Sequence, residues 1–131
     1  MGSCDPGLHD RRTLTVDRDA TAEALGSGDV PVLGTPALLA LAESACVAAI
    51  CNDLPEGCTS VGAWAEVDHQ RPTAVGGEVV ADATLIGHHG RRLEFQVIVR
   101  QDDEIVATVR HRRVLVDRAR FLAKIGGDKA A

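Results

Sequence analysis

The pattern of apolar and polar residues changes along this chain from alternation to a long apolar segment and back to alternation. These changes predict the positions of its helices and strands. Residues 12–18 alternate, with Leu14 and Val16 on one face, and predict a first strand. Residues 19–34 contain Gly and Pro at several positions and predict a loop with one helical turn near its start. A long apolar segment and a run of strands follow.

The apolar segment is residues 35–50, TPALLALAESACVAAI. Thr35 followed by Pro36 predicts a helix start, with the threonine as the N-cap and the proline at the first helical position. After Pro36 only Glu43 and Ser44 are polar. A helix that is apolar nearly all round must be covered nearly all round by other parts of the protein.

After this helix the pattern becomes that of β-strands. Mostly alternating, β-branched stretches occupy residues 59–69, 78–87, 92–100 and 104–116. Their short connections favour antiparallel neighbours, and residues 117–125 predict a helical turn. The order predicts an α+β fold of the hotdog type, with one long buried helix wrapped by a curved antiparallel sheet of about five strands. One sheet covers only part of such a helix, so we expect a homodimer.

Composition narrows the class of protein. A length of 131 residues suits a single domain over residues 1–131, and we expect flexible ends at 1–11 and 126–131. The formal net charge of −5 disfavours nucleic-acid and membrane partners. No signal-peptide pattern, long apolar span or CxxC pair occurs, so we expect a cytoplasmic protein without a metal site or cofactor.

Two polar residues stand out in apolar surroundings. Glu43 lies mid-helix, and it faces either a narrow exposed stripe with Ser44 or a ligand pocket, where a carboxylate can act as a base or nucleophile. His69 ends a strand whose odd positions, on one face, are apolar. It is either a structural hydrogen-bonding residue or a proton-transferring one. The odd-numbered face comprises Val61, Ala63, Ala65, Val67 and His69.

Three further residues each have a structural and a functional interpretation. Thr35 caps the helix, and a helix N-terminus also favours anions. Gly62 marks a β-bulge or a close approach of a ligand to the backbone, with its N–H offered to an oxyanion. Arg113 shares an apolar strand face with His111, which suggests an ion pair, a bound anion or surface snorkelling. Thr35 and Glu43 lie about 12 Å apart along a straight helix, so either the chain folds back or a site forms across two subunits.

Several ordered stretches together resemble the fluoroacetyl-CoA thioesterase family of hotdog thioesterases. They are GSGDVPVLGTPALLALAESA, SVGAWAEVDHQRPTAVGGEV, GRRLEFQV and RHRRVLV, and the resemblance covers roughly residues 12–122. It implies a homodimer with sites at the subunit interface. It also implies catalytic roles for Thr35, Glu43 and His69, and substrate or CoA binding by Gly62 and Arg113.

The expected activity is hydrolysis of an acyl-CoA thioester to the free acid and CoA. The stretch before Thr35, SGDVPVLG, lacks the aromatic lid of the fluoroacetyl-specific enzyme, so the resemblance does not extend to fluoroacetyl specificity. Two alternatives remain: a non-catalytic module that binds or senses acyl-CoA, and a hotdog hydratase or dehydratase. The latter's usual Asp/His pair is not evident in the sequence.

Overall fold

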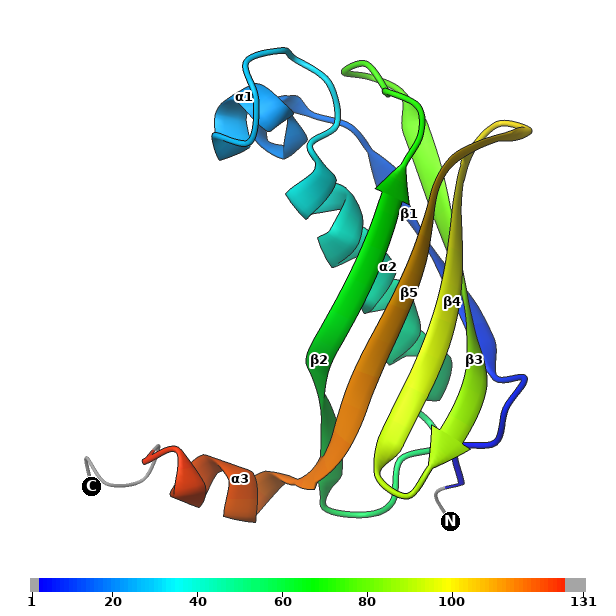
Figure 1. Ribbon diagram of the computed structural model, residues 1–131, viewed down its shortest axis with the longest axis vertical. Coiled ribbons are helices and arrows are strands. Elements are labelled where there is room, and N and C mark those ends of the chain that lie inside the picture. The colour runs from blue at the N-terminus through cyan, green and yellow to red at the C-terminus, as the bar shows by residue number, and fades with distance from the viewer. Residues whose placement is uncertain (1–2, 127–131) are drawn as a thin grey trace.

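One long helix packs into a curved antiparallel sheet in the computed structural model, which describes residues 3–126 (Figure 1). The α+β class and the five strands agree with the sequence prediction. The elements in chain order are β1 (His9–Thr15), a 3-10 turn (Arg18–Ala20), α1 (Ala22–Leu25), α2 (Thr35–Ile50), β2 (Cys58–His69), β3 (Glu78–His89), β4 (Arg92–Gln101), β5 (Glu104–Asp117) and α3 (Arg118–Lys124).

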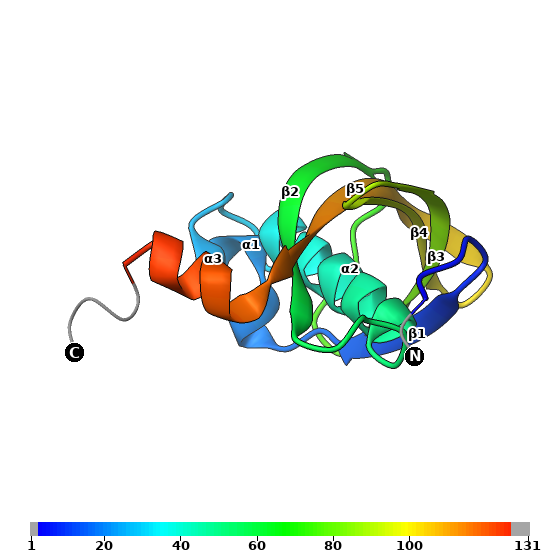
Figure 2. The same ribbon diagram turned by 90° about the horizontal axis from the view of Figure 1, so that it is seen from below.

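The strands form one sheet in the order β1-β3-β4-β5-β2, so β1 and β2 are its two edges. Seen from below, the sheet arches around α2 (Figure 2). Alternate residues of the three central strands point at the helix and are buried, which is the period-two pattern of a half-buried strand. They are Val79, Ala81, Ala83, Leu85, Leu93, Phe95, Val97, Val99, Ala107 and Val109.

The helix α2 is covered by the sheet on one side only. Leu38, Ala42 and Cys46 are fully buried against the sheet. On the opposite side Ser44 is exposed, and Val47 keeps 42% of its surface accessible. A single chain therefore leaves an uncovered stripe on a helix whose sequence is apolar nearly all round.

A β-bulge in β2 changes which residues face the helix. The pairing with β5 shifts between Gly62 and Trp64, so Ala63 is an extra residue in the ladder. Gly62 pairs with the buried Arg113 and therefore faces inward, as His69 does. The expected odd-numbered inner face was thus right from Ala65 onwards and wrong for Val61 and for Ala63, the bulge residue itself.

The N-terminal segment is packed rather than a free lead-in. β1 begins at His9, three residues earlier than the sequence suggested. Cys4 is 2% exposed, and its thiol donates to the carbonyl of Asp53 at 3.4 Å. The backbone N–H of Gly7 donates to the carbonyl of Leu85 at 2.8 Å. The remaining expected flexible positions, 1–2 and 127–131, lie outside the described residues.

Helix α3 leaves the body of the domain at the end of β5 and projects past the edge strand β2 (Figure 1). The N–H of Arg118 donates to the carbonyl of Gly57 at 3.0 Å, so α3 starts beside the beginning of β2. Within residues 3–126, none of the helices has the length and apolar character needed to cross a bilayer.

Candidate active site

The structure gathers the sequence-predicted site residues into two groups along α2. Thr35, at the first residue of the helix, joins His69 at the end of β2. Glu43, about 12 Å further along the helix, joins Gly62 and Arg113. Within one chain, no hydrogen bond or ion pair joins the two groups among the residues described.

The first group centres on a hydrogen bond of 2.8 Å between Thr35 Oγ1 and His69 Nδ1. The prediction of Thr35 as N-cap was wrong, because Gly34 occupies the cap position and no side chain caps the helix. The threonine hydroxyl is instead engaged by the histidine. The other ring nitrogen of His69, Nε2, is buried and has no hydrogen-bond partner among residues 3–126.

An open pocket of about 300 Å³ surrounds this hydrogen bond. Its wall combines apolar side chains such as Val32 and Leu33 with the polar Arg71 at β2's end. A buried polar atom without a partner costs about 1–3 kcal/mol, so Nε2 of His69 is a buried nitrogen with an unmet hydrogen bond in a residue that lines this pocket.

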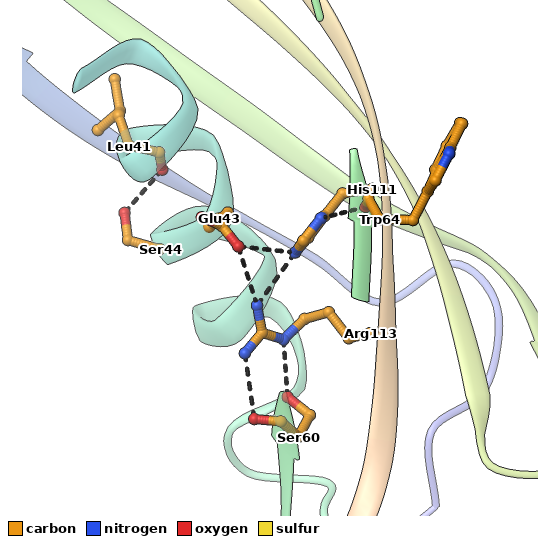
Figure 3. Close-up of polar contacts among 7 residues, drawn as sticks. All are labelled: Leu41, Glu43, Ser44, Ser60, Trp64, His111 and Arg113. Carbon is orange, nitrogen blue, oxygen red and sulfur yellow. Dashed lines mark hydrogen bonds and ion pairs between the residues drawn. The ribbon is translucent and has the colours of Figure 1, made fainter. Parts of the chain in front are cut away.

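The second group surrounds the carboxylate of Glu43, which points from α2 towards the sheet (Figure 3). Oε2 lies 3.3 Å from His111 Nε2 and 3.6 Å from Arg113 Nη1. The side chain retains 38% of its surface accessible. The carboxylate of Glu43 therefore points inward, whereas the exposed stripe carries Ser44, whose hydroxyl donates to the carbonyl of Leu41 at 2.7 Å.

Arg113 is held from several sides. Its Nε donates to Ser60 Oγ at 2.8 Å, and its Nη2 donates to the Ser60 carbonyl at 3.1 Å. The residue is 8% exposed, and burial lowers the pKa of its guanidinium, which the neighbouring Glu43 opposes. Arg113 thus occupies the inner face, where it fixes a positive charge beside Glu43, rather than a solvent-facing position.

His111 belongs to the same group, although it was not among the residues predicted from the sequence to have a role. Its Nδ1 lies 2.9 Å from the carbonyl of Trp64, and its Nε2 lies 3.0 Å from Arg113 Nη1. Burial is the main cause that lowers its pKa. The sequence signal was the spacing of two residues between His111 and Arg113, which places both on one strand face. Ser60 had no comparable signal.

Gly62 lies against this cluster. A Cβ at this position would stand 2.8 Å from Glu43 Oε2, 3.2 Å from His111 Cε1 and 3.4 Å from Arg113 Nη1. Contacts under 3 Å force a neighbour to move. The absence of a side chain at Gly62 is therefore what allows Glu43 to approach the strand.

Cys46 is the thiol nearest to this chemistry, one helical turn beyond Glu43. Burial raises its pKa to about 12, with Arg113 acting in the opposite direction. A thiol nucleophile must be a thiolate, so Cys46 does not suit that role. Within residues 3–126, no three His, Cys, Asp or Glu side chains gather as a metal site would require.

A second, larger groove of about 630 Å³ lies under α3, at the end of the sheet where β2 begins. Three cations line it, Arg91, Arg120 and Lys124, over an apolar floor that includes Val116 and Phe121. It contains none of the predicted catalytic residues. Its mixture of positive charge and apolar surface suits a phosphorylated ligand with a ring.

Comparison with known proteins gives a consistent family. The sequence profile described as fluoroacetyl-CoA-specific thioesterase matches residues 16–119. Among curated proteins, none matches the sequence significantly. A mutant of the fluoroacetyl-CoA-specific thioesterase, solved in complex with fluoroacetate and CoA, is 26% identical. The alignment covers 90% of this chain and 99% of that chain, with a TM-score of 0.82.

Two structures from other organisms share the fold at lower identity. A thioesterase superfamily member from Thermus thermophilus is 22% identical over 99% of this chain and 96% of its own, with a TM-score of 0.88. A hot-dog-like protein from Thermanaerovibrio acidaminovorans is 24% identical over 94% and 91%, with a TM-score of 0.85. These matches confirm the hotdog fold expected from the sequence.

Proposed function

Because this chain belongs to the fluoroacetyl-CoA-specific thioesterase family, we propose that it hydrolyses an acyl-CoA thioester to the free acid and CoA. The observation that carries the proposal is the Thr35–His69 hydrogen bond at a pocket, with Nε2 of the ring left without a partner. A proton-transferring histidine needs such an orienting bond and one free nitrogen. The carboxylate of Glu43, held beside His111 and Arg113, supplies the second reacting group, and a second copy of the chain brings it to this pocket.

In the proposed reaction, Glu43 acts on the thioester carbonyl carbon by one of two routes. As a nucleophile it forms a C–O bond to the acyl carbon while the C–S bond breaks, and water then hydrolyses the mixed anhydride. As a general base it takes a proton from water, which attacks the same carbon. In both routes the departing sulfur takes a proton from His69, and Thr35 and the Gly62 backbone N–H steady the developing oxyanion.

The proposed site is completed by a second copy of the chain. Strand β2 is a sheet edge of 12 residues, exposed over much of its length, and such an edge favours pairing with another strand. Antiparallel two-fold pairing along β2 places the Cys58 end of one strand beside the His69 end of the other. Helix α3 starts beside the Cys58 end of β2, so this pairing places the groove with Arg91, Arg120 and Lys124 next to the partner's pocket. There the groove would bind the CoA phosphates.

The loop before Thr35 bears on which acyl group the substrate carries. The loop that borders the pocket before Thr35 supplies Ser27, Val32 and Leu33 and contains no aromatic residue. The resemblance links fluoroacetyl selectivity to an aromatic lid, so we do not propose that selectivity here. A small apolar acyl chain fits the character of Val32 and Leu33.

The test is release of free thiol from acetyl, short-chain, branched, medium-chain, aryl and fluoroacetyl-CoA. Glu43→Gln and His69→Ala are each expected to lower turnover at least about tenfold while the dimer and its melting temperature are kept. The exposed Glu66→Gln is the matched control. Full activity in both site variants would refute the site. Binding of CoA esters without thiol release would indicate a binding module. A chemically altered acyl chain without release of free CoA would indicate a hydratase or dehydratase.

Subunit mixing tests whether the site is shared. If Glu43 of one subunit works with His69 of the other, a heterodimer of Glu43→Gln and His69→Ala chains contains one intact site. Random mixing of two inactive variants should then restore about a quarter of wild-type turnover. A site within one chain predicts no recovery, because both kinds of chain are defective.

A further inference from the structure

His111 is a buried titratable side chain that the proposed reaction does not use. It is 3% exposed and sits on the inner face of β5, between Glu43 of α2 and the Trp64 carbonyl of β2. The ring of Phe95 packs beside it, with centroids 6.4 Å apart. Both ring nitrogens have polar neighbours within hydrogen-bond distance, so the imidazole is held in one orientation.

The partners of His111 decide which nitrogen carries the hydrogen. The Trp64 carbonyl can only accept, so Nδ1, at 2.9 Å, is the donor. Arg113 Nη1 can only donate, so Nε2, at 3.0 Å, accepts. The ring is therefore neutral, with its hydrogen on Nδ1. The bulge at Ala63 contributes to this arrangement, because it lies directly before the residue whose carbonyl faces the ring.

A neutral His111 has a specific consequence for Glu43. The 3.3 Å between its Nε2 and Glu43 Oε2 is not a hydrogen bond, because both atoms present lone pairs. Arg113 Nη1 lies near both, 3.0 Å from Nε2 and 3.6 Å from Oε2. The carboxylate is thus oriented by one cation, and a protonated His111 would add a second cation that binds it directly.

The orientation of the Arg113 guanidinium depends on His111. The two contacts to Ser60 engage Nε and Nη2, which leaves Nη1 to be directed. Of the groups near Nη1, the imidazole Nε2 is the closer and the fully buried one. Without an acceptor there, Nη1 and the carboxylate are free to form a tighter mutual pair, which would draw Glu43 away from a substrate.

We propose that His111 is a positioning residue for the thioester reaction, which acts through Arg113 to hold the Glu43 carboxylate oriented but not tightly paired. The proposal rests on the role of Glu43 in the proposed function. His111 itself contacts no reacting atom in this scheme. Its contribution is the hydrogen-bond acceptor at the Nε2 position and the absence of charge there.

Two substitutions separate the two nitrogens of the ring. In His111→Gln the amide oxygen can take the Nε2 position and accept from Arg113. In His111→Asn the amide nitrogen can take the Nδ1 position and donate to the Trp64 carbonyl, but no acceptor remains for Arg113. His89→Asn, at the exposed end of β3, is the matched control.

The expected result is a difference between these variants in kcat at similar KM. His111→Asn should lose about tenfold or more in kcat, whereas His111→Gln should stay within about threefold of wild type. A purely structural role predicts instead that kcat falls in step with melting temperature in both variants. Equal kcat in the two variants would overturn the proposal.

A measurement on the wild-type protein does not depend on any variant folding. Nitrogen-15 NMR of the ring should show at neutral pH a protonated Nδ1 and an unprotonated Nε2. Two protonated nitrogens, or a hydrogen on Nε2, would overturn the inference even if thiol release is found. If wild type shows this tautomer but releases no thiol from any ester, the proposed function fails first and the positioning role fails with it.

Discussion

Replacement of Gly62 by alanine is the sharpest test of the Glu43 cluster. The new methyl would stand 2.8 Å from Glu43 Oε2, and ordinary contact begins near 3.4 Å, so the carboxylate must retreat by about 0.6 Å. The carboxylate is the end of a flexible, 38% accessible side chain and can swing outward. The substitution therefore displaces the candidate nucleophile or base and leaves the core almost untouched.

The expected effect on stability is small. Overpacking lowers the free energy of unfolding by about 1–3 kcal/mol. Because the Glu43 carboxylate can move away, we expect Gly62→Ala to lie at the low end of this range. Gly62 has no positive φ, so alanine fits the backbone and reduces the freedom of the unfolded chain, which returns about 0.4–1 kcal/mol. The melting temperature should shift by no more than a few degrees.

The expected effect on activity is large by comparison. Misplacement of a reacting group by about 1 Å can cost about a hundredfold, so a shift of this size should lower kcat by about tenfold or more. Thiol release and thermal melts would be measured side by side. Gly87→Ala is the control, because Gly87 also lies at a β-bulge and its Cβ would meet only His89 and Glu94, at 3.3 and 3.5 Å. Wild-type kcat in a folded Gly62→Ala protein would refute the importance of this contact.

Three further outcomes follow from the same geometry. His111 lies beside Glu43 and Arg113, and burial lowers its pKa below the ordinary 6.5. The folded protein therefore favours the neutral ring, and this contribution to the free energy of unfolding is complete above pH 6.5 and is lost as the pH falls below 6.5. Melts between pH 8 and pH 5 (about the range of imidazole titration) should show a weaker pH dependence in His111→Gln, and identical profiles would contradict the assignment. Arg113→Lys cannot reproduce the fork of contacts, so it should lose about 1–2 kcal/mol of stability and most activity, as denaturant unfolding and thiol release would show. An aromatic disulfide reagent should label the exposed Cys51 rapidly and the buried Cys46 only after unfolding, and mass spectrometry would reveal early labelling of Cys46 if this is wrong.

The fold was readable from the sequence because its signals are local. Strand alternation and short turns placed β2 to β5 within two residues of their observed ends. The helix α2 was equally clear, although Gly34 rather than Thr35 caps it. β1 was placed three residues late, since its exposed face is polar and its pattern short. These errors concern ends, where pairing and packing outweigh local preference.

The site was only partly readable, for a different physical reason. Thr35 and His69 were candidates in the sequence, but their hydrogen bond brings together the start of α2 and the end of β2. Ser60 and His111 are ordinary strand residues in the sequence. His111 already lies two residues from Arg113 on β5, but Ser60 becomes a neighbour of Arg113, and the Trp64 carbonyl a neighbour of His111, only through the pairing of β2 with β5. Such contacts depend on register, and composition and periodicity do not determine register where a bulge intervenes.

That bulge connects the local sequence to the chemistry of the candidate site. Without the extra residue Ala63, strict alternation would put Gly62 and His69 on opposite faces of β2. With it, Gly62 faces Glu43 while His69 still faces the start of α2. The same irregularity precedes Trp64, whose carbonyl fixes the tautomer of His111. Both groups of site residues therefore depend on one inserted residue in an edge strand. Ala63 is itself exposed, so we expect its deletion to lower activity much more than it lowers the melting temperature.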